Sequence, residues 1–178
     1  MSQFGSFLDT ETLQFKRVLT GNLELVWDCL TKSEHKGKWL SGGDVEPKVG
    51  GKVTHNFDHH SLSGEYEPLP EKYKDIGETS TMFGDVTIWN PYSKLSYTWN
   101  EVDNSSSEVT FELSEVGEDK VLLVLTHKRV PDSHDFKIGV SAGWHTHLNI
   151  LEDVLNQNKP KGFWSVHMPL EEEYEKLI

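Results

Sequence analysis

The stretch GWHTHLNILEDVL, residues 143–155, decides how the rest of the chain is arranged. Its apolar side chains and one histidine recur at the spacing of a single α-helical face: Trp144, His147, Leu148, Leu151, Val154 and Leu155. His145, Asn149, Glu152 and Asp153 fall largely on the other side. A helix with so wide an apolar stripe must bury it against a broad surface. We therefore expect this helix to lie across a sheet formed by the preceding residues.

Upstream of this helix, apolar and polar side chains alternate in short runs, which is the pattern of half-buried β-strands. The expected strands are 11–20, 44–46, 52–57, 79–89, 94–100, 108–114 and 120–127. In the strand at 79–89, Val86 and Ile88 are expected to share one face. The run 120–127 is apolar on both faces, which predicts a central strand that is covered on both sides for part of its length.

Two short helices are expected after the first strand. Residues 22–31 carry an amphipathic helical pattern, with Thr20 or Asn22 available as the N-terminal cap. A second helical turn opens at Ser33 and is anchored by the apolar pair Trp39-Leu40. Strands that are segregated from helices and joined by tight turns, including a polar turn at 103–107, indicate an α+β domain with an antiparallel sheet.

Two segments stand outside this pattern. Residues 58–78 contain Pro68 and Pro70 and have no clear periodicity, so they are either a functional or mobile loop that covers a cavity, or a solvated insertion without a role. Residues 158–178 follow the long helix and contain five apolar side chains within 163–170. So apolar a segment is expected to dock on the domain. We expect a single domain, 1–178, with a core at about 11–157.

Composition limits the classes of partner and cellular location. The chain has 178 residues and a net charge of −12, which argues against nucleic acid or an anionic membrane as partner because both require a basic surface. The lone Cys29 cannot form an internal disulfide and is expected to be a small buried hydrophobic residue. With neither an export signal nor a membrane-spanning run in view, we expect a cytoplasmic protein.

Five landmarks carry a family resemblance. They are Trp39-Leu40, PKVGGKV at 47–53, GDVTIWNPYSKLSYTW at 84–99, VTFELSEVGEDKVLLVLTH at 109–127, and the Gly143-Trp144 opening of the long helix. Their order resembles the helix-grip (START-like, SRPBCC) superfamily and, more narrowly, the activator of Hsp90 ATPase homologue 1-like family. The resemblance implies a curved antiparallel sheet of six to seven strands wrapped on a long C-terminal helix, with two short helices after the first strand.

The resemblance also implies a cavity between sheet and helix that binds a small, mostly apolar molecule. One wall of this cavity is expected to consist of Trp144, His147, Leu148 and Leu151, and the other of Tyr97, Trp99, Phe111 and Leu123. Two alternatives remain open. The first is a chaperone-associated protein-interaction module, and the second is an enzyme that uses His147 or Asp85 on a cavity-bound substrate.

His147 has two interpretations. It either meets the polar end of a ligand, or it is a core histidine that is hydrogen-bonded to a neighbouring side chain. His145 points to a different side of the helix, so the two imidazoles cannot chelate one metal ion as an i, i+4 pair would. We expect neither a metal nor another cofactor.

Overall fold

The computed structural model describes residues 1–99 and 107–178. The polar turn expected at 103–107 therefore lies outside the described residues except for Ser107, as does the last residue of the strand expected at 94–100. None of the helices formed by the described residues is both long enough and apolar enough to cross a membrane.

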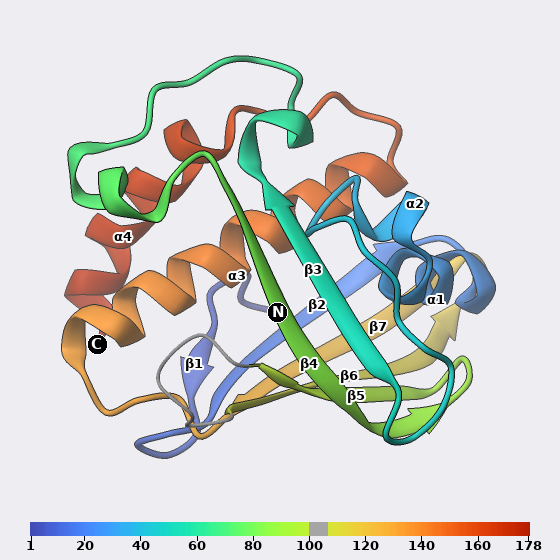
Figure 1. Ribbon diagram of the computed structural model, residues 1–178. Coiled ribbons are helices and arrows are strands. Elements are labelled where there is room, and N and C mark those ends of the chain that lie inside the picture. Colours follow the sequence, from blue (N-terminus) through green and yellow to red (C-terminus); the bar gives the residue numbers. More distant parts are fainter. Residues whose placement is uncertain (100–106) are drawn as a thin grey trace.

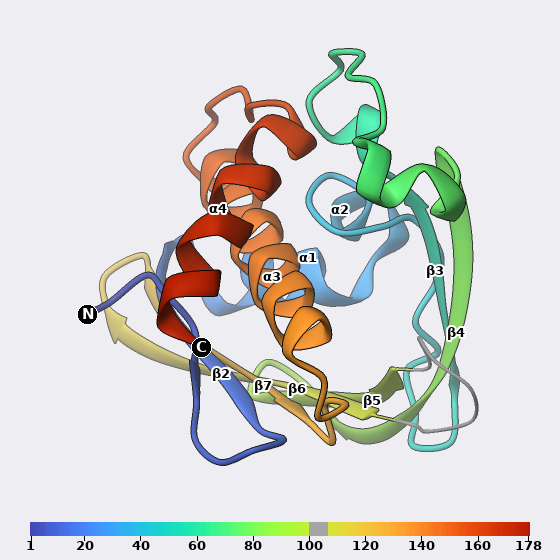
Figure 2. The same cartoon turned by 90° about the vertical axis from the view of Figure 1, so that its left-hand side faces the viewer.

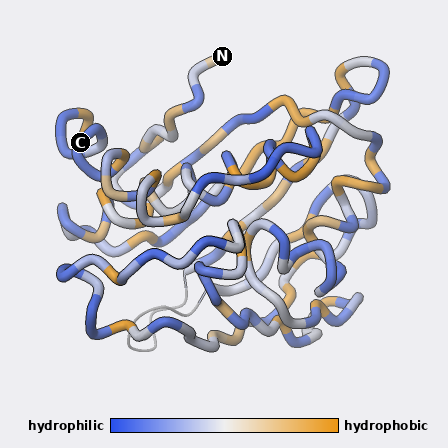
Figure 3. Tube along the Cα trace, turned by 90° about the horizontal axis from the view of Figure 1, so that it is seen from above, coloured by the Kyte–Doolittle hydropathy of each residue, from blue (hydrophilic) through white to orange (hydrophobic). Residues whose placement is uncertain are grey.

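A seven-stranded antiparallel sheet forms the base of the molecule, with the order β1-β2-β7-β6-β5-β4-β3. The strands are β1 Ser6–Phe7, β2 Leu13–Thr20, β3 Lys52–Asp58, β4 Thr79–Asn90, β5 Lys94–Trp99, β6 Ser107–Gly117 and β7 Lys120–Lys128. The edge strand β1 was not expected, and the strand expected at 44–46 is reduced to one bridge between Val45 and Val53. Short hydrophobic and hydrophilic stretches alternate along the chain (Figure 3).

The helices lie on the concave side of this sheet. They are α1 Leu23–Thr31, α2 Ser33–Lys36, α3 His134–Leu155 and α4 Phe163–Leu177. Asn22 caps α1, because its side chain accepts a hydrogen bond from the Leu25 backbone N–H. Helix α3 begins at His134, well before the expected start at 143, and Phe136 and Val140 in its first turns lie on the same face as Trp144 and His147.

The sheet curves around α3, with β3 and β4 rising beside the helix and β2, β7, β6 and β5 beneath it (Figures 1 and 2). This arrangement confirms the α+β helix-grip prediction. The core lies between the concave face and α3, where Phe111 and Leu123 of the sheet and Leu148 of the helix are almost completely buried. Cys29 is buried among hydrophobic residues as expected.

A β-bulge in β4 corrects one face assignment. Val86 pairs with Tyr97, whereas Ile88 pairs with Ser96 and Trp89 pairs with Leu95. Since residues paired across antiparallel strands share a face, Ile88 lies on the opposite face from Val86, and the prediction that they share a face is wrong. One extra residue in the strand reverses the alternation from that point on.

Helix α4 packs along α3 on the side that the sheet leaves open (Figure 2). The Tyr174 hydroxyl lies 3.0 Å from Nδ1 of His145 and also accepts a hydrogen bond from the Gly5 backbone N–H. Residues 58–78 contain two short 3-10 helices, η1 His59–Leu62 and η2 Glu71–Ile76. These two helices lie between the β3–β4 edge of the sheet and α4 (Figure 2).

Candidate ligand-binding pocket

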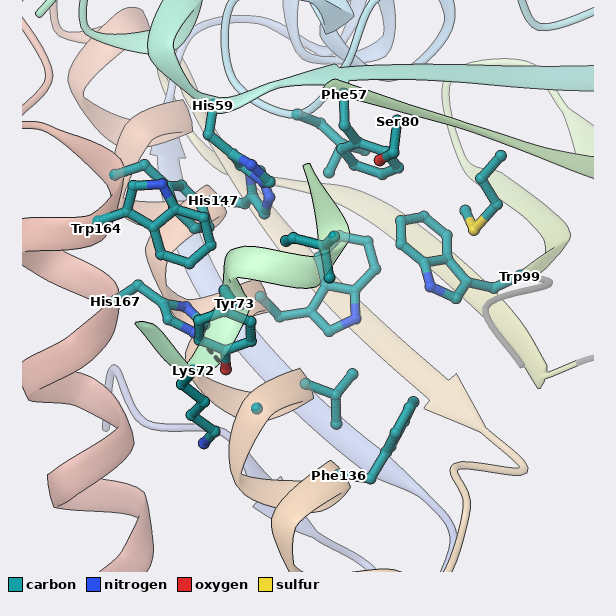
Figure 4. Close-up of a pocket in the computed structure, with 18 of the residues that line it drawn as sticks. Phe57, His59, Lys72, Tyr73, Ser80, Trp99, Phe136, His147, Trp164 and His167 are labelled. Carbon is teal, nitrogen blue, oxygen red and sulfur yellow. Dashed lines mark hydrogen bonds between the residues drawn. The ribbon is translucent and has the colours of Figure 1, made fainter. Parts of the chain in front are cut away.

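A pocket of about 1010 Å³ lies between α3, α4, strands β3 to β5 and residues 58–78; we call it the α3–α4 pocket (Figure 4). Its volume is at the upper end of the range of about 300–1,000 Å³ that is usual for small-molecule sites. His59, His147, Trp164 and His167 lie on one side of it, with Trp99 on the other (Figure 4).

Aromatic rings make up much of the wall. Trp99 of β5 and Trp144 of α3 lie with ring centroids 5.0 Å apart, and Tyr73 of η2 stacks on Trp164 of α4 at 5.1 Å. Phe136 adds a further ring from the first turn of α3. Rings supplied by four different elements give the α3–α4 pocket a large apolar surface that suits a flat ligand.

A buried chain of hydrogen bonds links the indole of Trp144 to the backbone of Trp99. The Trp144 indole N–H donates to Nδ1 of His127, so the imidazole proton is on Nε2. Nε2 of His127 donates to the Ser107 hydroxyl at 2.7 Å, and this hydroxyl donates to the Trp99 carbonyl at 2.8 Å. Burial lowers the pKa of His127 to about 3, which keeps the ring neutral and the direction of the chain fixed.

His147 reaches the pocket from α3. Its Nδ1 lies 2.7 Å from the backbone carbonyl of Trp39, and only 6% of the residue is exposed. Burial lowers its pKa to about 3, with a further contribution from the nearby His59, although the Trp39 carbonyl opposes the shift. The side chain is therefore a neutral imidazole near pH 7 rather than an acid or base that titrates there.

Three imidazoles surround the ring of Phe163, the first residue of α4. The ring centroids of His59, His147 and His167 lie 4.1, 5.0 and 5.3 Å from that of Phe163. Burial lowers the pKa of His59 to about 4, so its ring also is neutral at pH 7. Within residues 1–99 and 107–178, no three His, Cys, Asp or Glu side chains are grouped so that they could hold a metal ion.

Glu171 of α4 fastens η2 over the pocket. One of its carboxylate oxygens accepts from the Tyr73 hydroxyl and lies 3.1 Å from Nε2 of His167, and the other lies 2.9 Å from Nζ of Lys72. Burial raises the pKa of this carboxyl, but the hydrogen bonds from His167, Tyr73 and Lys72 outweigh burial and hold it at about 2. Glu171 is thus a carboxylate that ties η2 to α4.

The structure brings three of the eight residues expected to bind a ligand to this pocket: Trp99, Trp144 and His147. The other five are buried in the core and do not line it: Tyr97, Phe111, Leu123, Leu148 and Leu151. The reason is Trp39, which is fully buried, packs edge-on against Phe111 and fills the wedge between sheet and helix there. The open volume lies nearer the start of α3.

Sequence reasoning missed the part of the wall that comes from outside the sheet and α3: His59, Lys72, Tyr73, Phe163, Trp164 and His167. The available signals were the apolar run at 163–170 and the length of the 58–78 segment. Asp85, the second candidate for an enzyme, is exposed and does not line the pocket.

Comparisons with known proteins agree with this architecture. A protein of Bordetella parapertussis solved by NMR is 32% identical, covers 98% of this chain and 90% of its own, and superposes with a TM-score of 0.79. CalU16 of Micromonospora echinospora is 20% identical, with 93% of this chain and 87% of its own covered and a TM-score of 0.66. The latter similarity shows the fold alone.

A third similar structure, a conserved protein of unknown function from Enterococcus faecalis, is 20% identical, covers 98% of this chain and 92% of its own, and has a TM-score of 0.65. No curated protein matches the chain. The family model described as activator of Hsp90 ATPase homolog 1-like protein matches residues 21–156. The protein therefore belongs to the activator of Hsp90 ATPase homolog 1-like family.

Proposed function

We propose that this protein binds a small, largely apolar aromatic molecule in the α3–α4 pocket, with the polar end of the ligand near His147. The observation that carries the proposal is the pocket itself, a volume of about 1010 Å³ walled by aromatic rings. A few polar groups among apolar walls are typical of small-molecule sites. The family and the fold fit either a ligand-binding or an interaction domain.

The contacts follow from the placement of the side chains. Trp99 and Trp144 supply flat surfaces that are already buried, and the indole of Trp144 is also held by its hydrogen bond to His127, so ordering them on binding costs little. Tyr97, Phe111, Leu123, Leu148 and Leu151 act behind this wall, where they hold the sheet against α3. We assign His147 as the polar contact.

The test uses Gly143, a pocket residue in α3 whose added Cβ would meet no atom within 4 Å. Gly143→Leu should occupy part of the pocket next to Trp144, whereas Gly143→Ala adds only a Cβ in open space. Both replacements favour the helix, since glycine costs about 1 kcal/mol relative to alanine in a helix interior. The two variants therefore separate occupation of the pocket from a change in stability.

The experiment is a thermal-shift screen of lipids, aromatic compounds and polyketide-like compounds, combined with native mass spectrometry of the purified protein. A ligand at a hundred times its Kd should stabilise the parent and Gly143→Ala by about 2.7 kcal/mol. Gly143→Leu should weaken this effect. If no compound shifts the parent and no bound species is detected, the interaction-module alternative, with a chaperone or another protein as partner, replaces this proposal.

A further inference from the structure

The backbone carbonyl of Trp39, which lies behind the pocket wall, determines which nitrogen of His147 carries the proton. Its Nδ1 lies 2.7 Å from the Trp39 carbonyl oxygen, and a carbonyl can only accept, so Nδ1 carries the proton. A neutral imidazole has one N–H and one lone pair, which places the lone pair on Nε2. Among the hydrogen bonds made by the described residues, none reaches Nε2 of His147.

Nε2 lies on the side of the ring turned away from Trp39, and the side chain lines the pocket. Three rings lie near this imidazole, with centroids 5.0 Å (Phe163), 5.8 Å (His59) and 6.4 Å (Phe57) away. The two phenyl rings have no polar hydrogen to donate, and no hydrogen bond joins His59 to His147. Nε2 is not enclosed by the protein, so a donor on a ligand can reach it from the pocket and replace water there.

The charges around the pocket do not favour an anion at this point. The lone pair of Nε2 would repel a carboxylate oxygen, and the cation on the pocket wall, Lys72, already pairs with Glu171 at 2.9 Å. A ligand carbonyl or ether oxygen would also bring lone pair against lone pair. A hydroxyl or N–H group of the ligand, by contrast, would donate a hydrogen bond to Nε2 of His147.

Building on the proposed function, we infer that the ligand carries a hydrogen-bond donor, of the phenol or heteroaromatic N–H class, that binds to Nε2 of His147. The ring bearing the donor lies in the aromatic part of the pocket. His147 thus selects among flat apolar molecules by the presence of a donor, while Trp99 and Trp144 accept any flat ring. One residue would thus recognise the donor group, while the two tryptophans recognise the flat shape.

The probes are 2-naphthol and 2-methoxynaphthalene, which share a ring system but differ in the donor. Titration calorimetry on the full chain should give a Kd for 2-naphthol up to about tenfold lower, because one hydrogen bond donated in the pocket contributes up to about this much. In His147→Asn, the amide nitrogen can replace Nδ1 as donor to Trp39 while the Nε2 acceptor is lost. The preference for 2-naphthol should then disappear.

Histidine labelled with ¹⁵N provides a readout on the parent protein, independent of whether the variant folds. The lone-pair nitrogen of His147 should shift on addition of 2-naphthol and not on addition of 2-methoxynaphthalene. Equal affinity for both probes, or a preference that survives in His147→Asn, overturns the donor inference and leaves the proposed function standing. If neither probe nor any compound of the wider screen binds, the proposed function fails and this inference fails with it.

Discussion

The indole N–H of Trp144 on α3 donates a hydrogen bond to Nδ1 of His127 on β7, with 3.1 Å between the two nitrogens. The bond crosses from the long helix to the sheet, and Ser107 extends it to the backbone of Trp99. Helix and sheet are therefore joined at the pocket by a directed polar contact as well as by hydrophobic packing.

Ser107→Ala tests this contact. Removal of the hydroxyl leaves the N–H of His127 and the carbonyl of Trp99 without their partner, so the free energy of unfolding should fall by about 1–3 kcal/mol. Ser114→Ala is the matched control, because Ser114 is exposed on the same strand. Urea unfolding measures both, and equal stability of the two variants would contradict the chain of hydrogen bonds.

Glu171→Ala should loosen η2. The variant removes the acceptor that Tyr73 and Lys72 share, so cleavage within 58–78 by a nonspecific protease should accelerate by about tenfold if local opening becomes about 1.4 kcal/mol easier. The neighbouring Glu172 is exposed, and Glu172→Ala serves as control.

A bound ligand should slow cleavage within residues 58–78 of the parent protein if this segment is a lid. First cuts in the sheet turns would instead count against a lid.

Stability should fall as the pH drops from about 6.5 towards 4. Burial lowers the pKa of five histidines to values of about 2 to 4: His55, His59, His127, His145 and His147. The unfolded chain binds these protons near its ordinary pKa of 6.5 and the folded protein does not. Their contribution is therefore complete above pH 6.5 and is lost as the pH falls through the folded values.

Each buried histidine contributes up to about 1.4 kcal/mol per pH unit in this window. Urea unfolding at pH 7, 6 and 5 should show the loss, and His147→Asn should reduce the slope by about one proton. His134, whose side chain is 53% exposed, provides the control variant His134→Gln. A pH-independent stability would show that these rings are not held neutral in the folded state.

The fold could be predicted because most of its helices and strands show a recognisable pattern within a few consecutive residues. Alternation marked β5 and β6, the stripe from Trp144 to Leu155 marked the end of α3 that grips the sheet, and Asn22 marked the start of α1. The bulge in β4 could not be read in this way. It depends on pairing with β5, and the strand remains apolar on both sides of it.

The site could be predicted less completely from the sequence, because it depends on contacts between segments that lie far apart along the chain. Trp99, Trp144 and His147 lie in elements with clear patterns, whereas the place of Trp39 under α3 is set by packing and decides which part of the wedge stays open. Helix α4 contains Pro169, and because proline is unfavourable inside a helix, residue propensities do not predict a helix there. Lys36 shows the same limit: it is fully buried, and its Nζ donates to the carbonyls of Ser41, Gly42 and Thr54.

Helix α4 gives the pocket a modular character. The family region at 21–156 supplies strands β3 to β7 and α3, while Phe163, Trp164 and His167 lie beyond it and complete the wall. Substitutions in those three residues reshape the pocket without altering a residue of the sheet. The sheet and α3 can thus stay constant while substitutions in one helix change the wall of the pocket.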